Sequence, residues 1–222
     1  MIEHKFYKFP SIEQFRHQLK ALKDFIYFNG LVDDEPTFDY TRTLPTVTVN
    51  CTEKIHGTYA GVVYTDNQLY AQSRNKVLAI GDDNAGFALF VEQHNTLLIN
   101  ICTVLKQVCN LSDSDIILLS GEWAGGSIQK NSALSGVDKK FLIFPQFRVV
   151  HADESTSTLP ISELHLLSDS IYVLANFPDA TFSTAINFES EVSINDFLAL
   201  MESRIAAIEE SSPVGRYFNL SN

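Results

Sequence analysis

A lysine that could act as a nucleophile lies in residues 52–58 (TEKIHGT), directly after an alternating run that ends at Cys51. The amine of Lys54 would sit at the end of a strand, in a turn closed by Gly57. A lysine attacks only as the neutral amine, and about one free lysine in 2,500 is neutral at pH 7. Such a residue must therefore be activated by neighbouring cations or by desolvation, which we expect from apolar neighbours such as Ile55.

Other side chains that could take part in chemistry follow in a fixed order. Arg74 ends the segment AQSR, Glu122 lies within GEWAGGSIQKN, and Phe144 ends KFLIF. Taken singly, each has an ordinary structural explanation: an isolated lysine or glutamate is usually solvated, and alternate residues of an apolar run belong to the core. The order of the segments, and not any single residue, indicates a functional site.

Together these segments resemble the ATP-dependent RNA ligases of the covalent nucleotidyltransferase superfamily. The pattern Lys-x-His-Gly-Thr and the pattern Gly-Glu-aromatic-Ala-Gly-x-x-Ile-Gln-Lys-Asn are similar to the phage RNA ligase 2 branch, which includes the RNA-editing ligases. The similarity is best over residues 40–150. It implies a role in RNA repair in which Lys54 attacks the α-phosphorus of ATP. The resulting lysine–AMP passes AMP to an RNA 5′-phosphate, and a 3′-hydroxyl then seals the RNA ends.

The resemblance also implies roles for the surrounding side chains. His56 would be a second catalytic residue, and Glu53 would line the ATP pocket. Arg74 would contact the ribose or a phosphate through its planar guanidinium. Glu122 would accept a hydrogen bond from a ribose hydroxyl, and Phe144 would stack on adenine. Mg²⁺ is expected beside the ATP phosphates, with no residue assigned as a metal ligand.

Two positions depart from the family pattern. Tyr59 stands where an asparagine usually follows Lys-x-His-Gly-Thr, and that asparagine serves the later steps, so the departure concerns sealing more than adenylylation. Pro145 replaces a common aspartate after Phe144. Because proline has no amide donor, we expect the strand to bend or to run along a sheet edge there.

Two motifs expected near the end of such a domain are not found. One is a Glu-Gly segment that binds the metal, and the other is a Lys-x-Lys strand that holds the ATP phosphates. No lysine follows Lys140, and the acidic segment FESEV at residues 188–192 lacks the glycine. We therefore expect a domain that is incomplete at its C-terminus, poorly active alone and completed by a companion chain. The alternatives are a non-catalytic pseudo-ligase that binds nucleotide or RNA ends, and an unrelated α+β interaction protein.

Composition limits the function in other ways. A net charge of −11 argues against a protein that coats duplex nucleic acid through bulk positive charge, although a local basic cleft remains compatible with it. The three cysteines have no metal-ligand spacing and are expected to be small buried residues in a reducing compartment. Without an apolar leader or a membrane-length run, a cytoplasmic protein is expected, in the host cytoplasm if the source is viral.

The elements that must position these residues can be predicted from periodicity. We expect an α+β fold with antiparallel sheets and flanking helices, that is, a nucleotidyltransferase (ATP-grasp-like ligase) domain at 46–222 preceded by a helix and loop at 1–45. The first helix would start at 10–14 with a capping box from Ser11 and Gln14, and end at Asn29-Gly30. The other predictions are a loop at 31–45, strands at 47–51, 59–64 and 69–74 with a turn at Asp66-Asn67, a helix at 87–108, strands at 116–120, 141–150 and 171–174, a polar loop at 155–158, and a helix from 193–196 to 208.

Overall fold

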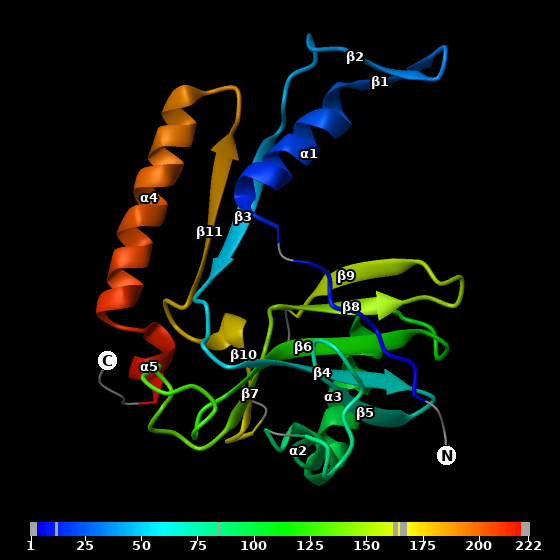
Figure 1. The fold of residues 1–222 in the computed structure, drawn as a ribbon, viewed down its shortest axis with the longest axis vertical. Helices are drawn as coiled ribbons and strands as arrows, with labels where there is room; N and C mark the ends of the chain where they lie inside the picture. The colour runs from blue at the N-terminus through cyan, green and yellow to red at the C-terminus, as the bar shows by residue number, and fades with distance from the viewer. Residues whose placement is uncertain (1–3, 12, 84, 162–163, 165–167, 219–222) are drawn as a thin grey trace. The chain divides into compact units, whose positions relative to one another are not determined.

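The protein is described from a computed structural model, which covers residues 4–11, 13–83, 85–161, 164 and 168–218 (Figure 1). The chain divides into two compact units, each built from separate stretches of sequence. Unit 1 comprises Met1–Lys8, Thr52–Thr181 and Glu210–Asn222, and unit 2 comprises Phe9–Cys51 and Phe182–Glu209. The expected boundary between residues 45 and 46 stays a prediction.

Unit 1 is built on a seven-stranded sheet. Strand β6 is its centre, because it pairs antiparallel with β4, β7 and β8. The main path runs β10-β7-β6-β4-β5, and β9 joins through β8. Only the β10–β7 pair is parallel among the pairs described. The strands are β4 (Thr58–Thr65), β5 (Gln68–Gln72), β6 (Ile116–Ala124), β7 (Lys140–Ile143), β8 (Gln146–Val150), β9 (Thr156–Pro160) and β10 (Ile171–Val173).

The predicted turn between β4 and β5 is confirmed. Asp66 and Asn67 have φ angles of 48° and 58°, which match the left-handed conformation that short hairpin turns require. Asn and Asp adopt this conformation more readily than other side chains do. The hydroxyl of Tyr64 also donates to Oδ1 of Asn67 at 2.9 Å, which ties the turn to β4.

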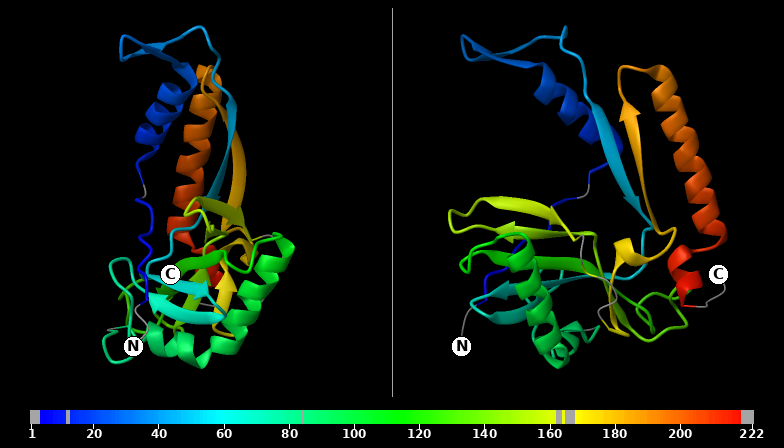
Figure 2. Two further views of the ribbon diagram at one scale, coloured as in Figure 1. Left: turned by 90° about the vertical axis from the view of Figure 1, so that its right-hand side faces the viewer. Right: turned by 180° about the vertical axis from the view of Figure 1, so that it is seen from behind.

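Two helices, α2 (Phe87–Gln93) and α3 (Asn95–Val108), cover one face of this sheet (Figures 1 and 2). Their apolar faces pack into the main core, where Phe87 and Phe141 lie with ring centroids 5.0 Å apart. The prediction of one helix over 87–108 was wrong at His94, whose φ of −107° and ψ of 16° separate the two. At the break the His94 ring is held on both sides, by Ser170 Oγ at 3.1 Å and by the Phe90 carbonyl at 2.9 Å.

The predicted strand 141–150 is divided at Pro145. β7 ends at Ile143 and β8 begins at Gln146, and each pairs with a different stretch of β6. The expected bend at the proline is thus confirmed.

The prediction of a polar loop at 155–158 was wrong, because β9 pairs there with β8. The turn before β9 is closed by the carboxylate of Asp153, which accepts a hydrogen bond from the Ser155 amide at 2.9 Å.

Unit 2 contains two helices, a hairpin and a two-stranded sheet. The sheet joins β3 and β11, which are distant in sequence. Phe197 of α4 stacks on Phe15 of α1 with ring centroids 5.5 Å apart, which joins the two helices of the unit. The elements are α1 (Phe15–Tyr27), β1 (Phe28–Val32), β2 (Glu35–Phe38), β3 (Thr46–Thr52), β11 (Thr181–Asn187) and α4 (Glu191–Glu210).

Several predictions for unit 2 were wrong. The expected loop at 31–45 contains most of the β1–β2 hairpin, whose turn residues Asp33 and Asp34 have φ angles of 52° and 64°. Helix α1 begins at Phe15, and its N-cap residue Gln14 makes no side-chain cap, so the capping box is absent. Helix α4 starts at Glu191, two residues before the predicted position.

The observed architecture is nevertheless the expected mixture of α-helices and antiparallel sheet. No helix in the described part of the chain is long and apolar enough to cross a membrane.

Candidate functional site

Two of the expected site residues, Glu122 and Phe144, lie on the sheet face opposite α2 and α3. Residues directly opposed in an antiparallel pair point to the same face. Glu122 opposes Tyr59 on β4 and Leu142 on β7. Two residues along β6, Ser120 continues this face, and its carbonyl accepts from the Phe144 amide at 2.8 Å. The registers therefore place Glu122 and Phe144 on one face, whereas their neighbours in sequence point into the helix-covered core.

The lysine segment leads from unit 1's edge into β4 in an extended form. Burial alternates along it: Glu53 and Ile55 are 6% and 7% exposed, whereas Lys54 and His56 are exposed. Lys54 and His56 thus share the solvent side of the segment. Desolvation of the lysine by Ile55 is not observed, because Ile55 packs into the second core cluster of unit 1.

Gly57 brings the lysine segment against β6. A Cβ atom at this position would lie 2.7 Å from the carbonyl oxygen of Trp123 and 3.2 Å from Oε2 of Glu122. Any larger residue would push the segment away from the strand, so the glycine allows the close approach. The first pair of the β4–β6 ladder, Thr58 with Trp123, follows immediately. The lysine motif and the Gly-Glu motif are therefore in direct contact.

The carboxyl of Glu122 is subject to the charges of two other expected site residues. Burial raises the pKa of Glu122 to about 7, and the positive charges of Lys54 and Arg74 act on the same carboxyl in the opposite direction. Near neutral pH this carboxyl therefore exists in both protonation states and can donate or accept a hydrogen bond. Lys54, Arg74 and Glu122 come from three separate segments of sequence, and the charges of the first two act on the Glu122 carboxyl, which lies beside Gly57.

Glu53 is held on the other side of the segment. Its Oε2 accepts from the Val214 amide at 3.0 Å, and its Oε1 accepts from the Ser212 hydroxyl. Ser212 is the N-cap of the short helix α5 (Pro213–Tyr217), and its Oγ also accepts from the Gly215 amide at 2.9 Å. The residue that precedes Lys54 thus anchors the segment to α5. Sequence reasoning did not find this contact, whose only signal was a serine before a proline at a helix start.

The match to known protein families covers residues 47–197, and the family is described as RNA ligase. This range is more than half of the chain and contains every expected site residue. The chain belongs to the RNA ligase family. None of the curated proteins matches the sequence. Family membership confirms the coarse expectation of a ligase enzyme that acts on RNA.

In this RNA ligase family member, the site face also carries Tyr59, the departure from the family pattern, and two residues that the sequence did not single out, Ser120 and Arg148. The hydroxyl of Tyr59 bonds Ser120 Oγ at 2.9 Å. Burial raises the pKa of Tyr59, and the charges of Arg148 and Arg74 oppose that shift. Arg148 opposes Leu118 of β6 and donates to the Lys8 carbonyl at 2.9 Å. The sequence did carry a signal for Arg148, because it lies between core residues of β8. Alternation along a strand puts its side chain on the face opposite to theirs.

The remaining expected residues are distributed around this centre. Phe144 is half-buried and packs against the cluster that contains Ile55 and Leu142. Arg74 follows β5 and is exposed, as is His56. The charges of Lys54 and Arg74 therefore both act on Glu122, and Phe144 lies on the same sheet face as Glu122. The structure directs the Glu53 carboxylate toward α5.

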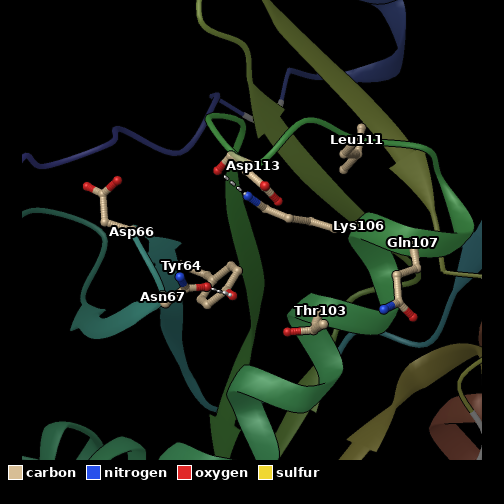
Figure 3. A pocket seen from close by; sticks show the side chains of 8 residues that line it. All are labelled: Tyr64, Asp66, Asn67, Thr103, Lys106, Gln107, Leu111 and Asp113. Carbon is tan, nitrogen blue, oxygen red and sulfur yellow. Dashed lines mark hydrogen bonds between the residues drawn. The ribbon is translucent and has the colours of Figure 1, made fainter.

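A separate hollow lies at the far end of β4 (Figure 3). It has a volume of about 370 Å³ and none of the expected site residues lines it. Lys106 reaches across it and donates to the Asp113 carbonyl at 2.7 Å, so its amine already has a partner. The walls come from Tyr64, Asp66, Asn67, Thr103, Lys106, Gln107, Leu111 and Asp113. This hollow is distinct from the lysine site, which adjoins the first residue of β4.

Proposed function

We propose that this RNA ligase family member is an ATP-dependent ligase that joins RNA 5′-phosphate and 3′-hydroxyl ends through a Lys54–AMP intermediate. The proposal includes a covalent nucleotidyltransferase fold for the chain and membership of the phage RNA ligase 2 branch. One observation carries it: the Gly-Glu motif contacts the lysine segment at Gly57, and the charges of Lys54 and Arg74, from two other segments, both act on the Glu122 carboxyl. An amine, a guanidinium and a carboxyl are the groups that the first step requires.

In the first step, the neutral Lys54 amine attacks the α-phosphorus of ATP. A phosphorus–nitrogen bond forms, the bond from the α-phosphorus to the bridging oxygen breaks, and pyrophosphate leaves while the amine proton passes to solvent. In the second step, an oxygen of the RNA 5′-phosphate attacks the AMP phosphorus and releases Lys54. In the third step, a 3′-hydroxyl attacks the activated 5′-phosphate, its proton is lost, and AMP departs.

The other residues would bind and orient the nucleotide. The exposed guanidinium of Arg74 suits a phosphate or the ribose, because its planar donors match anionic oxygens. Glu122 would bond a ribose hydroxyl, and Phe144 would stack on adenine from the same sheet face. His56 shares the exposed side of Lys54 and would act beside it in catalysis. Glu53, proposed as a wall of the ATP pocket, would support Lys54 from behind through its bonds to α5.

ATP and Mg²⁺ are the proposed cofactors, and RNA ends are the proposed substrate. The described residues contain no group of three or more His, Cys, Asp or Glu placed to hold a metal ion, so we assign no metal ligand and no step to Mg²⁺. A companion chain that supplies a Glu-Gly segment and a Lys-x-Lys strand stays a prediction, as does the cytoplasmic location.

The proposal is tested by incubating the purified chain with ATP labelled at the α-phosphate and Mg²⁺, with and without a separate polypeptide that carries both motifs. We expect label on the protein that acid removes, as a phosphoramidate requires, and no label on Lys54→Ala. Lys5→Ala, at an exposed position of unit 1 outside the motifs, serves as a control that keeps the site intact. A protein without label under both conditions, or label that survives in Lys54→Ala, would contradict the proposal.

The second candidate is a pseudo-ligase that binds nucleotide or RNA ends without sealing them. Tyr59 supports it, because its side chain occupies the site face and is bonded to Ser120 where the family has an asparagine. RNA carrying a 5′-adenylate separates the two candidates, since it needs only the last step. Sealing of this RNA supports the ligase. Saturable ATP binding without label or sealing supports the pseudo-ligase.

A further inference from the structure

Unit 2 carries a basic stripe on α1. Arg16, Lys20 and Lys23 follow one another at intervals of four and three residues, so they lie on one face of the helix. Tyr27 continues the same face four residues after Lys23. No residue of α1 is buried, and none of the three cations forms an ion pair or side-chain hydrogen bond with any described residue. Arg16 and Lys20 are exposed and Lys23 is half-buried, so these unpaired charges are available to a ligand.

This concentration of positive charge contrasts with the chain as a whole, whose net charge is −11. Within α1 the only acidic residue is Asp24, and the ring of His17 is bonded to Glu13 at 3.2 Å. An uncompensated row of cations on an acidic protein favours binding of an anionic partner at that row. The negative charges elsewhere on the protein would repel such a partner from other surfaces.

The stripe ends at a group of aromatic rings, in which Tyr27 is half-buried and Phe38 and Tyr40 are exposed. Tyr27 meets Tyr40 edge to face with centroids 5.2 Å apart, and Tyr40 stacks on Phe38 at 6.0 Å. Tyr40 is 74% exposed and Phe38 is 39% exposed. Exposed aromatic faces beside cations are the combination that binds single-stranded nucleic acid, where rings stack on bases and cations contact phosphates.

Arg42 holds the helix and the hairpin in this arrangement. Its guanidinium donates to the carbonyls of Ile26 and Phe28 at 3.1 and 2.9 Å and to Asn29 Oδ1 at 2.5 Å. These bonds span the junction where α1 passes directly into β1 (Figure 1). Arg42 also pairs with Asp39 at 3.4 Å, which reduces the negative charge beside Tyr40. The stripe and the rings are thus fixed to one another by bonds within unit 2.

The acidic groups of the hairpin limit the extent of this surface. Asp33, Asp34 and Glu35 lie together at the β1–β2 turn and would repel phosphates there. The helix α1 joins the opposite end of the hairpin, at Phe28. The favourable surface is therefore confined to the stripe and the rings beside the junction.

We propose that Arg16, Lys20, Lys23, Tyr27 and Tyr40 form a binding surface for single-stranded RNA, the strand end that the ligase must hold. The choice of RNA rests on the proposed function, whereas the cations and rings are independent of it. The three cations contact successive phosphates, and the two tyrosines stack on bases at the end of the stripe. A protein partner is less well matched, because the stripe is cationic along its whole length and uncompensated.

The test measures binding of a fluorescein-labelled single-stranded RNA of mixed sequence by anisotropy, over a range of salt concentrations. The triple variant Arg16→Ala/Lys20→Ala/Lys23→Ala is compared with Lys5→Ala/Lys8→Ala/Lys76→Ala, which removes the same charge from exposed positions of unit 1. We expect the first variant to bind at least about tenfold more weakly, with the slope of log K against log salt reduced by about 2, since each contact adds about 0.7. The unit 1 variant should keep the wild-type slope.

Tyr40→Ala and Tyr40→Phe test the aromatic contribution. We expect Tyr40→Ala to weaken binding roughly tenfold and Tyr40→Phe to keep it, because stacking needs the ring and not the hydroxyl. Equal losses in both triple variants, no loss in either, or equal affinity for duplex RNA would overturn the proposal. The proposal would also be overturned if the α1 triple variant changed the mass measured by light scattering without changing the affinity for RNA, because the stripe would then control self-association. Lys54 labelling is measured in parallel, so RNA binding without label would contradict the ligase proposal and leave this surface standing.

Discussion

Units 1 and 2 differ in how they use their apolar side chains. In unit 1, Phe87, Phe141 and Phe147 are almost completely buried between the sheet and its helices. In unit 2, only Leu44, Ile186 and Phe197 are buried apolar residues among those described, whereas Phe25 is 78% exposed. A packed core resists displacement, because any shift loses contacts on every side.

This difference in packing suits the two units to different tasks. Unit 1 can hold Lys54, Arg74 and Glu122 at defined positions, because Glu122 lies in β6, Lys54 shortly precedes β4, Arg74 shortly follows β5, and these strands are backed by a continuous core. Unit 2 has few buried apolar residues, and its exposed apolar and basic residues are available to a ligand. The contrast predicts that equivalent substitutions have large effects on stability in unit 1 and small effects in unit 2.

The largest expected effect is from Phe141→Ala in unit 1. Its ring is fully buried and contacts Phe87, so the substitution leaves a cavity in the main core. We expect a loss of about 3–5 kcal/mol in the free energy of unfolding. Urea denaturation followed by circular dichroism measures it. A loss below about 1 kcal/mol would mean that the core of unit 1 is not packed as described.

A smaller effect is expected from Ser212→Ala, which removes one donor from the buried carboxylate of Glu53. Hydrogen bonds to charged groups contribute about 1.5–3 kcal/mol, so we expect a loss of about 2 kcal/mol. Ser211→Ala is the matched control, because its side chain makes no hydrogen bond within the described part of the chain. Equal losses from the two variants would show that the α5 anchor adds nothing.

The same variant should affect the site, because Glu53 directly precedes Lys54. Hydrogen exchange of residues 53–57 should be faster in Ser212→Ala than in Ser211→Ala. In a Glu53→Gln background the additional effect of Ser212→Ala should be smaller, since both changes weaken one contact, and what remains is the lost cap at the Gly215 amide. Additive effects of the two substitutions would contradict a shared contact.

Glu122→Gln tests the electrostatics of unit 1. The folded-state pKa of Glu122, about 7, lies above the ordinary value of 4.5. Between these two values the unfolded chain ionises first, so stability falls as pH rises from about 4.5 through 7. We expect Glu122→Gln to match the wild type at pH 5 and to have a Tm roughly 2 °C higher at pH 8. Thermal melts across this range measure the gap, and a constant gap would contradict the raised pKa.

The smallest expected effect is from Phe25→Ala in unit 2. The ring is largely exposed, so its removal creates no cavity, and the change in stability should stay within about 0.5 kcal/mol. The urea denaturation used for Phe141→Ala measures it directly. A loss comparable to that of Phe141→Ala would remove the distinction between the two units.

Local sequence was sufficient where neighbouring residues decide the conformation. The Asp66-Asn67 turn and the interruption at Pro145 were predicted, because left-handed φ angles and a missing amide are properties of the residues themselves. The Asp33-Asp34 hairpin was not predicted, since it lacks the glycine that usually marks such turns. β9 was missed because a serine- and threonine-rich segment forms a strand only where a partner such as β8 is available.

The order of motifs around Lys54, Arg74 and Glu122 is a property of the sequence, and it was enough to identify the RNA ligase family and the residues of interest. Their proximity depends on the register between β4 and β6 and on the close approach at Gly57. Only the tertiary structure decided that Glu53 bonds Ser212, 159 residues away, and that the chain forms two interleaved units. Contacts over such separations leave no local pattern, because they depend on how distant segments pack and not on the residues beside them.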